Sequence, residues 1–363
     1  MIADDLLREE LVPMAPYAIP HPPGIRARLD ANESPHPLPP EVAAELGRHL
    51  TAVALHRYPD GRATDLRALV AREHGVDPAQ LVFGNGSDEI ITLLMDAFGR
   101  PRAGRARPAA LYPVPSFVVY RIAALGHGFL PVEVPLGEDF TLDPAAAHRA
   151  MERERPNLAY FALPNNPTGT LWPRAEIAAL VEQFPDVLVI ADEAYFAYSG
   201  ETWLDLLPRH PNLAVMRTLS KIGLAGLRVG YLVAHPQVAA ALEKIRPPYN
   251  IGSVNQAAAA FMLSRHRDLL DGAAREVVAE RERVVAALAS MPGLRVFPTR
   301  ANFVLVRTAR ATETWQRLAD GGVLVRNFDR PGPHPLAGCL RITIGTRDEN
   351  QLLIDLWSAI SRT

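Results

Sequence analysis

Short apolar runs alternate with helical patterns along the first two thirds of the chain. Apolar runs bounded by glycine, proline or polar residues are typical of buried strands. They lie at residues 81–83, 109–112, 129–134, 158–163, 187–191, 213–216 and 229–234. Helical patterns fall between most of these runs. The alternation predicts an α/β domain in which a mostly parallel sheet is buried between layers of helices.

The pattern changes after residue 245. Two long helical patterns, at 255–264 and 266–290, precede further strand candidates and a last helix, which predicts a smaller α+β domain. These strand candidates are 294–297, 303–307, 323–326 and 340–344, and the last helix is 348–360. Two more helices, at 40–54 and 64–74, are expected before the first strand.

These patterns divide the chain of 363 residues into three parts. We expect an N-terminal arm (1–38) that packs on the small domain or on a partner subunit. A large domain (39–245) and a small C-terminal domain (246–363) follow it. A chain of this length is long enough for two domains around a large core.

Composition narrows the classes of partner and compartment. Lysine and arginine total 38 against 40 for aspartate and glutamate, so a formal net charge of −2 indicates neither nucleic acid nor an anionic membrane as a partner. No apolar run approaches the roughly 18 residues of a membrane span. The only cysteine is Cys339, which excludes an internal disulfide and a cysteine-rich metal cluster. We therefore expect no metal site and a reducing, cytoplasmic compartment.

Polar residues gather directly after several of the predicted strands. Since ligands of open α/β sheets bind at the carboxyl ends of the strands, these residues are candidates for a site. They are Gly84-Asn85-Gly86-Ser87-Asp88 after the first strand, Asn165-Asn166-Pro167-Thr168-Gly169 after the fourth, Asp192-Glu193-Ala194-Tyr195 after the fifth and Ser220-Lys221 after the sixth. The glycine loop opens a helix, where backbone N–H groups bind anions.

Each motif also has an ordinary structural explanation. An N-cap by Ser87 explains the glycine loop equally well, and Asn-Pro sequences are common in turns. Asp192 is equally typical of a cap on the next helix. Lys221 by itself is better explained as a solvated loop lysine. The order of the motifs, rather than any one of them, is what points to a function.

The end of the sixth strand has the most specific chemistry. Lys221 stands beside two hydroxyls, and Arg228 follows seven positions later. An amine nucleophile next to an anion site suits pyridoxal 5′-phosphate (PLP), which combines an aldehyde with a phosphate.

The motifs, taken in order, resemble those of the fold type I PLP-dependent aminotransferases over nearly the whole chain. Within that group the chain resembles the histidinol-phosphate aminotransferases. The motifs that carry the resemblance are Leu29-Asp30-Ala31-Asn32-Glu33, Arg57-Tyr58-Pro59-Asp60, Gly84-Asn85-Gly86-Ser87-Asp88-Glu89, Asn165-Asn166-Pro167-Thr168-Gly169, Thr218-Leu219-Ser220-Lys221, Leu224-Ala225-Gly226-Leu227-Arg228 and Cys339-Leu340-Arg341-Ile342-Thr343-Ile344-Gly345-Thr346. The combined set is highly specific.

The resemblance implies which residues bind the cofactor and carry out catalysis. Lys221 would hold PLP covalently and shuttle a proton, Asp192 would pair with the pyridine nitrogen, and Tyr195 would hydrogen-bond the phenolic oxygen. The other cofactor-binding residues would be Ser87, Asp88, Thr218, Ser220 and Arg228 at the phosphate, Asn166 at the phenolic oxygen and Phe117 stacked on the ring, where relatives often have tyrosine.

The resemblance also implies the substrates and a partner. Transamination of L-histidinol phosphate with 2-oxoglutarate would give imidazole acetol phosphate and glutamate, a step of histidine biosynthesis. Arg341 matches the arginine that binds either anion, and Arg326, Tyr17 and Asn32 match further substrate-binding positions. Tyr58 matches a residue that reaches the cofactor phosphate of the neighbouring subunit, which implies a homodimer with shared active sites.

Two departures from the family pattern bear on these assignments. The link from Lys221 to Arg228 is one residue shorter than the commoner version, which bears on the reach of Arg228. A stretch rich in proline and glycine, 331–335, separates Arg326 from Arg341. Either Arg326 or a neighbour therefore completes the expected phosphate site.

Three alternative functions remain open. An aromatic amino acid aminotransferase or a PLP-dependent phosphothreonine decarboxylase would use the same scaffold and similar motifs. The arginines and tyrosines expected near the substrate do not distinguish an aromatic amino acid aminotransferase from a histidinol-phosphate aminotransferase. The third is a regulator that joins this fold to a DNA-binding domain. We expect no such domain, because only about 30 residues precede the Asp-x-Asn-Glu motif, and the intact Lys221 argues against an inactive homologue.

Overall fold

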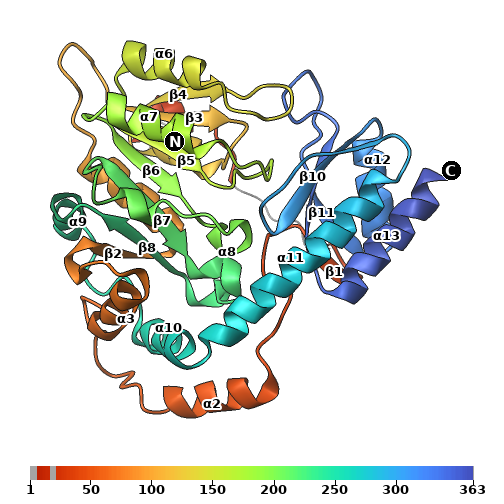
Figure 1. The fold of residues 1–363 in the computed structure, drawn as a ribbon, viewed down its shortest axis with the longest axis horizontal. Helices are drawn as coiled ribbons and strands as arrows, with labels where there is room; N and C mark the ends of the chain where they lie inside the picture. The colour runs from red at the N-terminus through yellow and green to blue at the C-terminus, as the bar shows by residue number, and fades with distance from the viewer. Residues whose placement is uncertain (1–5, 17–21, 363) are drawn as a thin grey trace.

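The structure, a computed structural model, describes residues 6–16 and 22–362. Two sheets form two lobes of unequal size, each with helices around it (Figure 1). The larger sheet has seven strands in the order β2-β8-β7-β6-β5-β3-β4. In chain order they are β2 (Leu81–Asn85), β3 (Ala109–Val114), β4 (Leu130–Pro135), β5 (Leu158–Ala162), β6 (Leu188–Asp192), β7 (Leu213–Thr218) and β8 (Val229–Ala234).

Most of the larger sheet is parallel. The strands β7, β6, β5, β3 and β4 pair in parallel with one another, whereas β8 is antiparallel to both β7 and β2. The mostly parallel α/β sheet predicted from the sequence is therefore confirmed. The carboxyl ends of β5, β6 and β7 lie side by side, which brings together the motifs that follow these strands.

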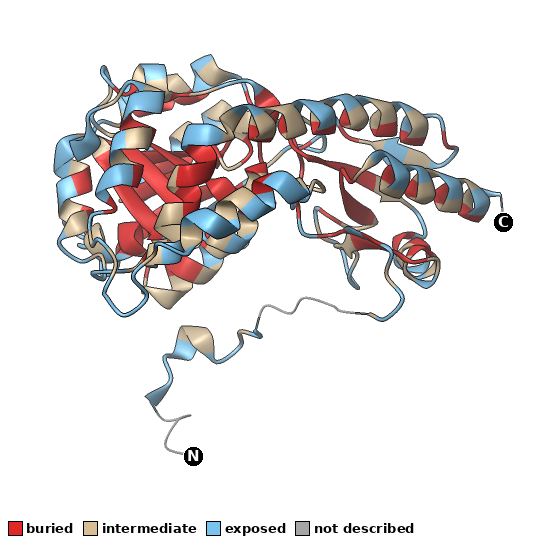
Figure 2. Cartoon of the chain, turned by 90° about the horizontal axis from the view of Figure 1, so that it is seen from below, coloured by how far each residue is buried: buried red, intermediate tan, exposed pale blue. Residues whose placement is uncertain are grey.

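Helices cover both faces of the larger sheet, so that its strands, apart from the edge strand β4, are almost entirely buried (Figure 2). Neighbouring strand residues point to opposite faces, as Tyr160 and Phe161 do. One face packs against α4 (Gly86–Ala97), α5 (Val119–Gly126) and α9 (Pro236–Glu243), and the other against α3 (Thr64–His74), α6 (Pro144–Glu154), α7 (Arg174–Gln183) and α10 (Ser253–Arg265). The first predicted helix is α2 (Pro40–Leu50), with proline at its first position.

The smaller sheet has five strands in the order β1-β11-β12-β10-β9. These strands are β1 (Ala27–Leu29), β9 (Leu294–Val296), β10 (Phe303–Thr308), β11 (Val323–Asn327) and β12 (Cys339–Thr343). The sheet packs with α11 (Arg267–Ala289), α12 (Ala311–Asp320) and α13 (Arg347–Ser361). The sequence did not predict β1, which lies in the expected N-terminal arm and pairs in parallel with β11. The boundaries of the arm and the two domains stay a prediction.

The helix α11 connects the two lobes. Its buried Arg281 donates hydrogen bonds to the carbonyl of Tyr198 at 3.2 Å and to that of Ala301 at 3.1 Å. Tyr198 belongs to α8 (Phe196–Ser199), which follows β6, whereas Ala301 lies two residues before β10. One guanidinium therefore fixes the end of β6 relative to the smaller sheet.

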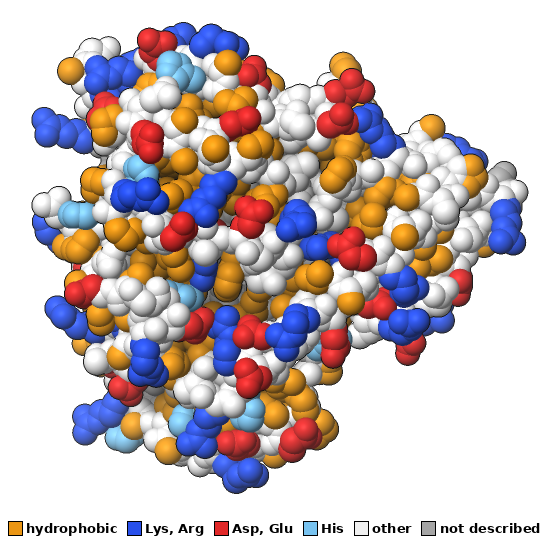
Figure 3. Space-filling model, viewed as in Figure 1, with side chains coloured by type: hydrophobic (Ala, Val, Ile, Leu, Met, Phe, Trp, Pro, Cys, Tyr) orange, Lys and Arg blue, Asp and Glu red, His pale blue; other side chains and the backbone are white. Residues whose placement is uncertain are grey.

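Acidic and basic side chains are interspersed over the face of the molecule in Figure 3, and neither sign forms a large patch there. Among the described residues, no helix has the length and apolar character needed to cross a membrane.

Candidate active site

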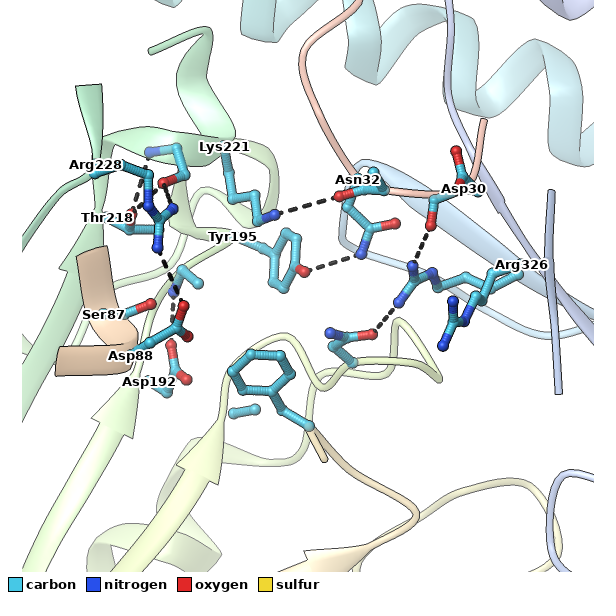
Figure 4. Close-up of a pocket in the computed structure, with 17 residues that line it drawn as sticks. Asp30, Asn32, Ser87, Asp88, Asp192, Tyr195, Thr218, Lys221, Arg228 and Arg326 are labelled. Atoms are coloured by element: carbon cyan, nitrogen blue, oxygen red, sulfur yellow. Dashed lines mark hydrogen bonds and ion pairs between the residues drawn. The ribbon is translucent and has the colours of Figure 1, made fainter. Parts of the chain in front are cut away.

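Residues from both lobes line a cavity of about 320 Å³ at the carboxyl ends of β5, β6 and β7 (Figure 4). Most of the site residues predicted from the sequence lie there. They are Asn32, Ser87, Asp88, Phe117, Asn166, Asp192, Tyr195, Thr218, Ser220, Lys221, Arg228, Arg326 and Arg341.

Lys221 follows β7 in a 3-10 turn, η4 (Leu219–Ile222). The turn is held at its start because the hydroxyl of Thr218 accepts a hydrogen bond from the N–H of Ser220 at 3.1 Å. The hydroxyl of Tyr198 donates to the carbonyl of Lys221, and the Lys221 Nζ donates to the carbonyl of Ala31 at 3.4 Å. The backbone on both sides of this lysine is thus fixed, while its amine points into the cavity.

The surroundings of Lys221 make its amine more reactive. Desolvation, and to a lesser degree the positive charge of Arg341, lowers its pKa from 10.5 to about 8. A larger fraction of the amine is then neutral near pH 7, as a nucleophile requires. This environment contradicts the interpretation of Lys221 as a solvated loop lysine.

Arg228 and the first turn of α4 form an anion site beside Lys221. The Arg228 Nη1 lies 3.4 Å from the Ser220 Oγ, and its Nη2 lies 3.1 Å from the Asp88 Oδ2. The helix begins at Gly86, so the N–H groups of Ser87 and Asp88 belong to its first turn, where they lack partners within the helix. The N-cap is Asn85 rather than Ser87, so the N-cap explanation of Ser87 is wrong.

Two glycines let Arg228 and α4 approach each other, although the segment from Lys221 to Arg228 is one residue shorter than the commoner version. A Cβ on Gly86 would stand 2.5 Å from the Arg228 Nη2, and a Cβ on Gly230 would stand 2.5 Å from the backbone N of Ser87. Arg228 itself has a φ of 49°, in the left-handed region. With these adjustments its guanidinium lines the cavity.

Asp192 is the last residue of β6 and is 5% exposed. Its Oδ1 accepts a hydrogen bond from the N–H of Ala194 at 3.0 Å, and its Oδ2 accepts one from the hydroxyl of Tyr120 at 2.5 Å. Burial, with smaller contributions from Asp88 and Glu193, raises the pKa of Asp192 to about 6, against the lowering effect of these hydrogen bonds. A buried carboxylate in this state gains strongly from a cationic partner.

Three predicted residues lie between the two ends of the cavity. Tyr195 accepts a hydrogen bond from the Asn32 Nδ2 at 2.9 Å, and its ring centre lies 5.9 Å from the Lys221 Nζ. The Oδ1 of Asn166 accepts one from the Arg341 Nη1 at 2.6 Å. The neighbouring Asn165 bonds instead to the protein backbone and to Thr168, which stabilises the turn.

Two arginines stand at the end of the cavity that belongs to the smaller sheet. Arg326 on β11 and Arg341 on β12 are directly opposite each other in an antiparallel pair, and both line the cavity. The Arg341 Nη2 also donates to the carbonyl of Asp30 at 2.7 Å. Like charges directly across two strands destabilise a sheet, so the pair favours an anion between or beside the two guanidinium groups.

The sequence matches a known protein family over most of its length. The family model for aminotransferase class I and II matches residues 26–356. The chain belongs to this family. It is 43% identical to the histidinol-phosphate aminotransferase of Chromobacterium violaceum, across 100% of this chain and 99% of that protein.

Solved structures of other proteins agree with the assignment of the chain to this aminotransferase family. The structure of the histidinol-phosphate aminotransferase from Sinorhizobium meliloti in complex with pyridoxal 5′-phosphate is similar, with a TM-score of 0.81 and 28% identity over 93% of this chain and 91% of that one. The L-threonine-O-3-phosphate decarboxylase from Porphyromonas gingivalis shares the fold, with a TM-score of 0.77 at 23% identity over 93% of this chain and 100% of that one. The predicted family and fold class are confirmed.

One predicted site residue lies away from the cavity, and another falls outside the residues that the structure describes. Tyr58 is 82% exposed and stacks on Tyr249 at 4.8 Å, away from the cavity of its own chain. Tyr17 lies outside the described residues.

Four residues that line the cavity were not predicted from the sequence, namely Asp30, Ala31, Ala162 and Ala194. Two of them, Asp30 and Ala31, stand in the Asp-x-Asn-Glu motif, which could have indicated them. Ala162 and Ala194 carry no polar side chain, and only the positions of their neighbours place them at the site.

Proposed function

We propose that the protein is a PLP-dependent aminotransferase that moves the amino group of L-histidinol phosphate to 2-oxoglutarate, giving imidazole acetol phosphate and glutamate. The cavity supports this proposal because it pairs a reactive amine and a buried carboxylate with two arginines at its other end. The observation that carries it is the cross-strand arginine pair, Arg326 and Arg341. Guanidinium groups bind both phosphate and carboxylate well.

The residues of the cavity fit PLP. Lys221 provides an amine for the aldehyde, and Asp192 provides a carboxylate for the pyridine nitrogen. Ser220 and Arg228 form a phosphate site with the first turn of α4, and a side chain on Gly86 would obstruct the Arg228 guanidinium. When bound, PLP supplies an electron-withdrawing ring that makes the Cα–H of an amino substrate acidic.

The side chains then divide the chemical work. The neutral amine of Lys221 would hold the cofactor and would carry a proton at its Nζ to and from the substrate Cα. Asp192, held ionised by two hydrogen bonds, would keep the proton on the pyridine nitrogen. Tyr195 and Asn166 would hydrogen-bond the phenolic oxygen, and Phe117 would pack against the ring.

The two substrates alternate at the arginine end of the cavity. Arg341 binds the carboxylate of glutamate or the phosphate of histidinol phosphate, since its planar fork suits both. Arg326 adds a second cation for the phosphate, which carries the greater charge. Asn32 lies beside Tyr195, between the two ends of the cavity, and Tyr17 is assigned to the phosphate subsite from the sequence alone.

The same proposal includes a homodimer in the cytoplasm. Exposed apolar side chains gather in two segments, at Leu55 and Tyr58 and at Ile245, Tyr249 and Val254. Such a patch is typical of an interface with another protein. The single cysteine, which is buried, supports a reducing compartment.

Steady-state kinetics with three amino substrates test the proposal. Histidinol phosphate with 2-oxoglutarate should give a higher kcat/KM than phenylalanine, and phosphothreonine should not lose carbon dioxide. A preference for phenylalanine would identify an aromatic aminotransferase instead. Release of carbon dioxide from phosphothreonine would identify a decarboxylase.

Arg326→Ala tests the phosphate site within this assay. Losing a charge-assisted hydrogen bond should raise the KM for histidinol phosphate about 10- to 150-fold, and that for glutamate much less. Arg330→Ala, which removes an exposed arginine four positions later, is the matched control and should change neither. Equal losses for both substrates in Arg326→Ala would show that Arg326 is structural.

A further inference from the structure

Tyr120 lies beneath the floor of the cavity and is absent from the motifs that indicated the site. It stands in α5, is fully buried, and does not line the cavity itself. Its hydroxyl lies 2.5 Å from the Asp192 Oδ2. Because the other oxygen of Asp192 accepts the N–H of Ala194 at 3.0 Å, the carboxylate is held at both oxygens.

The ring of Tyr120 is also held in place, by contacts with two other aromatic rings. On one side it stacks on Tyr160 with a centroid distance of 4.9 Å and an interplanar angle of 21°. On another side it meets Phe117 edge to face, at 5.6 Å and 90°. The N–H of Tyr120 also donates to the carbonyl of Phe117 at 3.2 Å. One side chain therefore contacts both Asp192 and Phe117.

A phenol is a suitable donor for this carboxylate. The titratable groups that interact with Asp192 include Asp88 on α4 and Glu193, the residue that follows β6, and both disfavour its charge. A cationic side chain at the position of Tyr120 would also keep Asp192 ionised, but it would neutralise the negative charge of the carboxylate. A neutral hydroxyl stabilises the ionised form and leaves its negative charge available to a ligand.

We propose that Tyr120 is a positioning residue that holds the Asp192 carboxylate and the Phe117 ring in a fixed relation, so that the pyridine nitrogen and the ring face of the cofactor are engaged together. The inference rests on the proposed PLP chemistry. Tyr120 acts through its two neighbours and does not touch the cofactor.

Tyr160 offers a matched control. It is as deeply buried as Tyr120 and stacks on it, but within the described part of the chain its hydroxyl has no hydrogen-bond partner. Tyr160→Phe thus removes a buried hydroxyl from the same cluster without removing a bond to Asp192. Tyr120→Phe removes the bond and keeps the ring, and Tyr120→Leu removes both.

Two measurements on these variants report on the cofactor independently of turnover. The first is the Kd of PLP, by titration of each apoenzyme, and the second is the nitrogen-15 chemical shift of the pyridine nitrogen in enzyme loaded with labelled PLP. Tyr120→Phe should raise the Kd about 10-fold or more and move the shift towards that of a neutral pyridine. Tyr160→Phe should change the Kd less than about twofold, because it breaks no hydrogen bond.

A double-mutant cycle separates positioning from general support of the fold. In an Asp192→Asn background the hydroxyl has lost its charged partner, so adding Tyr120→Phe should have little further effect on either measurement. Equal effects of Tyr120→Phe in both backgrounds, or no difference between Tyr120→Phe and Tyr160→Phe, would overturn the role of the hydroxyl. If Tyr120→Leu matched Tyr120→Phe, the support of Phe117 would be overturned. Failure of the wild type to bind PLP would instead refute the proposed function.

Discussion

The reactivity of a single amine decides what the cavity can do. Lys221 is one of only two lysines in the chain, and the other, Lys244, is exposed on the surface. With a pKa of about 8, about a tenth of Lys221 is neutral at pH 7, against about 0.03% for an amine with the ordinary value of 10.5. The protein thus prepares the nucleophile before any ligand arrives.

This difference can be measured by competitive labelling of the apoenzyme. Acetic anhydride reacts only with neutral amines, and mass spectrometry of the digested protein follows both lysines in the same sample. Because the folded protein lowers the pKa of Lys221, its labelling should rise with pH and level off just above pH 8. The labelling of Lys244 in the same sample corrects for changes in the reactivity of the reagent with pH. Labelling of Lys221 that continues to rise through pH 10 would show that its amine is not perturbed.

The sequence identified most of the residues at the site but not all of them. Ser87, Asn166, Asp192 and Lys221 each follow a predicted strand, and the order of these strand ends was enough to associate them. Tyr120 gave no such signal, because one tyrosine on an amphipathic helix is typical of core packing. Its contact with Asp192 depends on how α5 lies across the sheet, which no local pattern encodes.

At the scale of elements, a buried ion pair joins the ends of β6 and β7. Glu193 is fully buried and Arg217 is 3% exposed, with the Arg217 Nη2 2.7 Å from the Glu193 Oε2. Thr202 bonds to both side chains, and the Arg217 guanidinium lies 3.8 Å from the centre of the Phe196 ring. Since Glu193 follows Asp192 and Arg217 precedes Thr218, the pair fixes two strand ends that carry site residues.

Breaking this pair should destabilise the fold strongly. Arg217→Met leaves a buried carboxylate without its partner and should lower the free energy of unfolding by about 3–5 kcal/mol. The double variant with Glu193→Leu should lose less, because no lone charge remains buried. Urea denaturation of the apoenzyme measures both.

An exposed ion pair serves as the control for that experiment. Arg310 lies 3.6 Å from Glu313 on the surface, and Arg310→Met should cost less than about 1 kcal/mol. If Arg217→Met cost no more than Arg310→Met, the buried pair would not be what holds β6 and β7 together.

Element prediction succeeded where the periodicity was local. The helix expected at 64–74 and the strand expected at 229–234 have the predicted bounds as α3 and β8. The strand β1 was missed because its three residues carry too short a pattern. It is defined by parallel pairing with β11, nearly the whole chain away. The order of strands within each sheet depends on such distant pairings and not on periodicity.

At the scale of the whole molecule, the cavity depends on how the two lobes meet. Arg326 and Arg341 come from the smaller sheet, whereas Lys221 and Asp192 come from the larger one. No spacing in the sequence encodes the distance between these sets. The family resemblance supplied their association, and contacts such as those of Arg281 produce it physically.

Tyr58, which the family resemblance assigns to the active site, lies away from the cavity of its own chain. Tyr58, which is largely exposed, stacks on the partly exposed Tyr249. Two stacked aromatic rings at the surface are a costly arrangement for a monomer, because their apolar faces contact water. In a twofold dimer the same surface meets its counterpart, and a residue of one subunit can complete the site of the other. This arrangement is the one implied by the proposed function.

Mixing two defective variants tests whether Tyr58 acts on the partner subunit. Tyr58→Ala and Lys221→Ala should each have little activity alone. In a heterodimer, one site combines an intact Lys221 with the intact Tyr58 of the other subunit, while the second site lacks both. After free exchange of equal amounts, half of the dimers are mixed, so activity should recover to about a quarter of the wild-type value. The control is Lys221→Ala mixed with Asp192→Asn, because both residues belong to the same chain's site and no exchange can restore one. Recovery in neither mixture, with exchange verified by native mass spectrometry, would place Tyr58 outside a shared site.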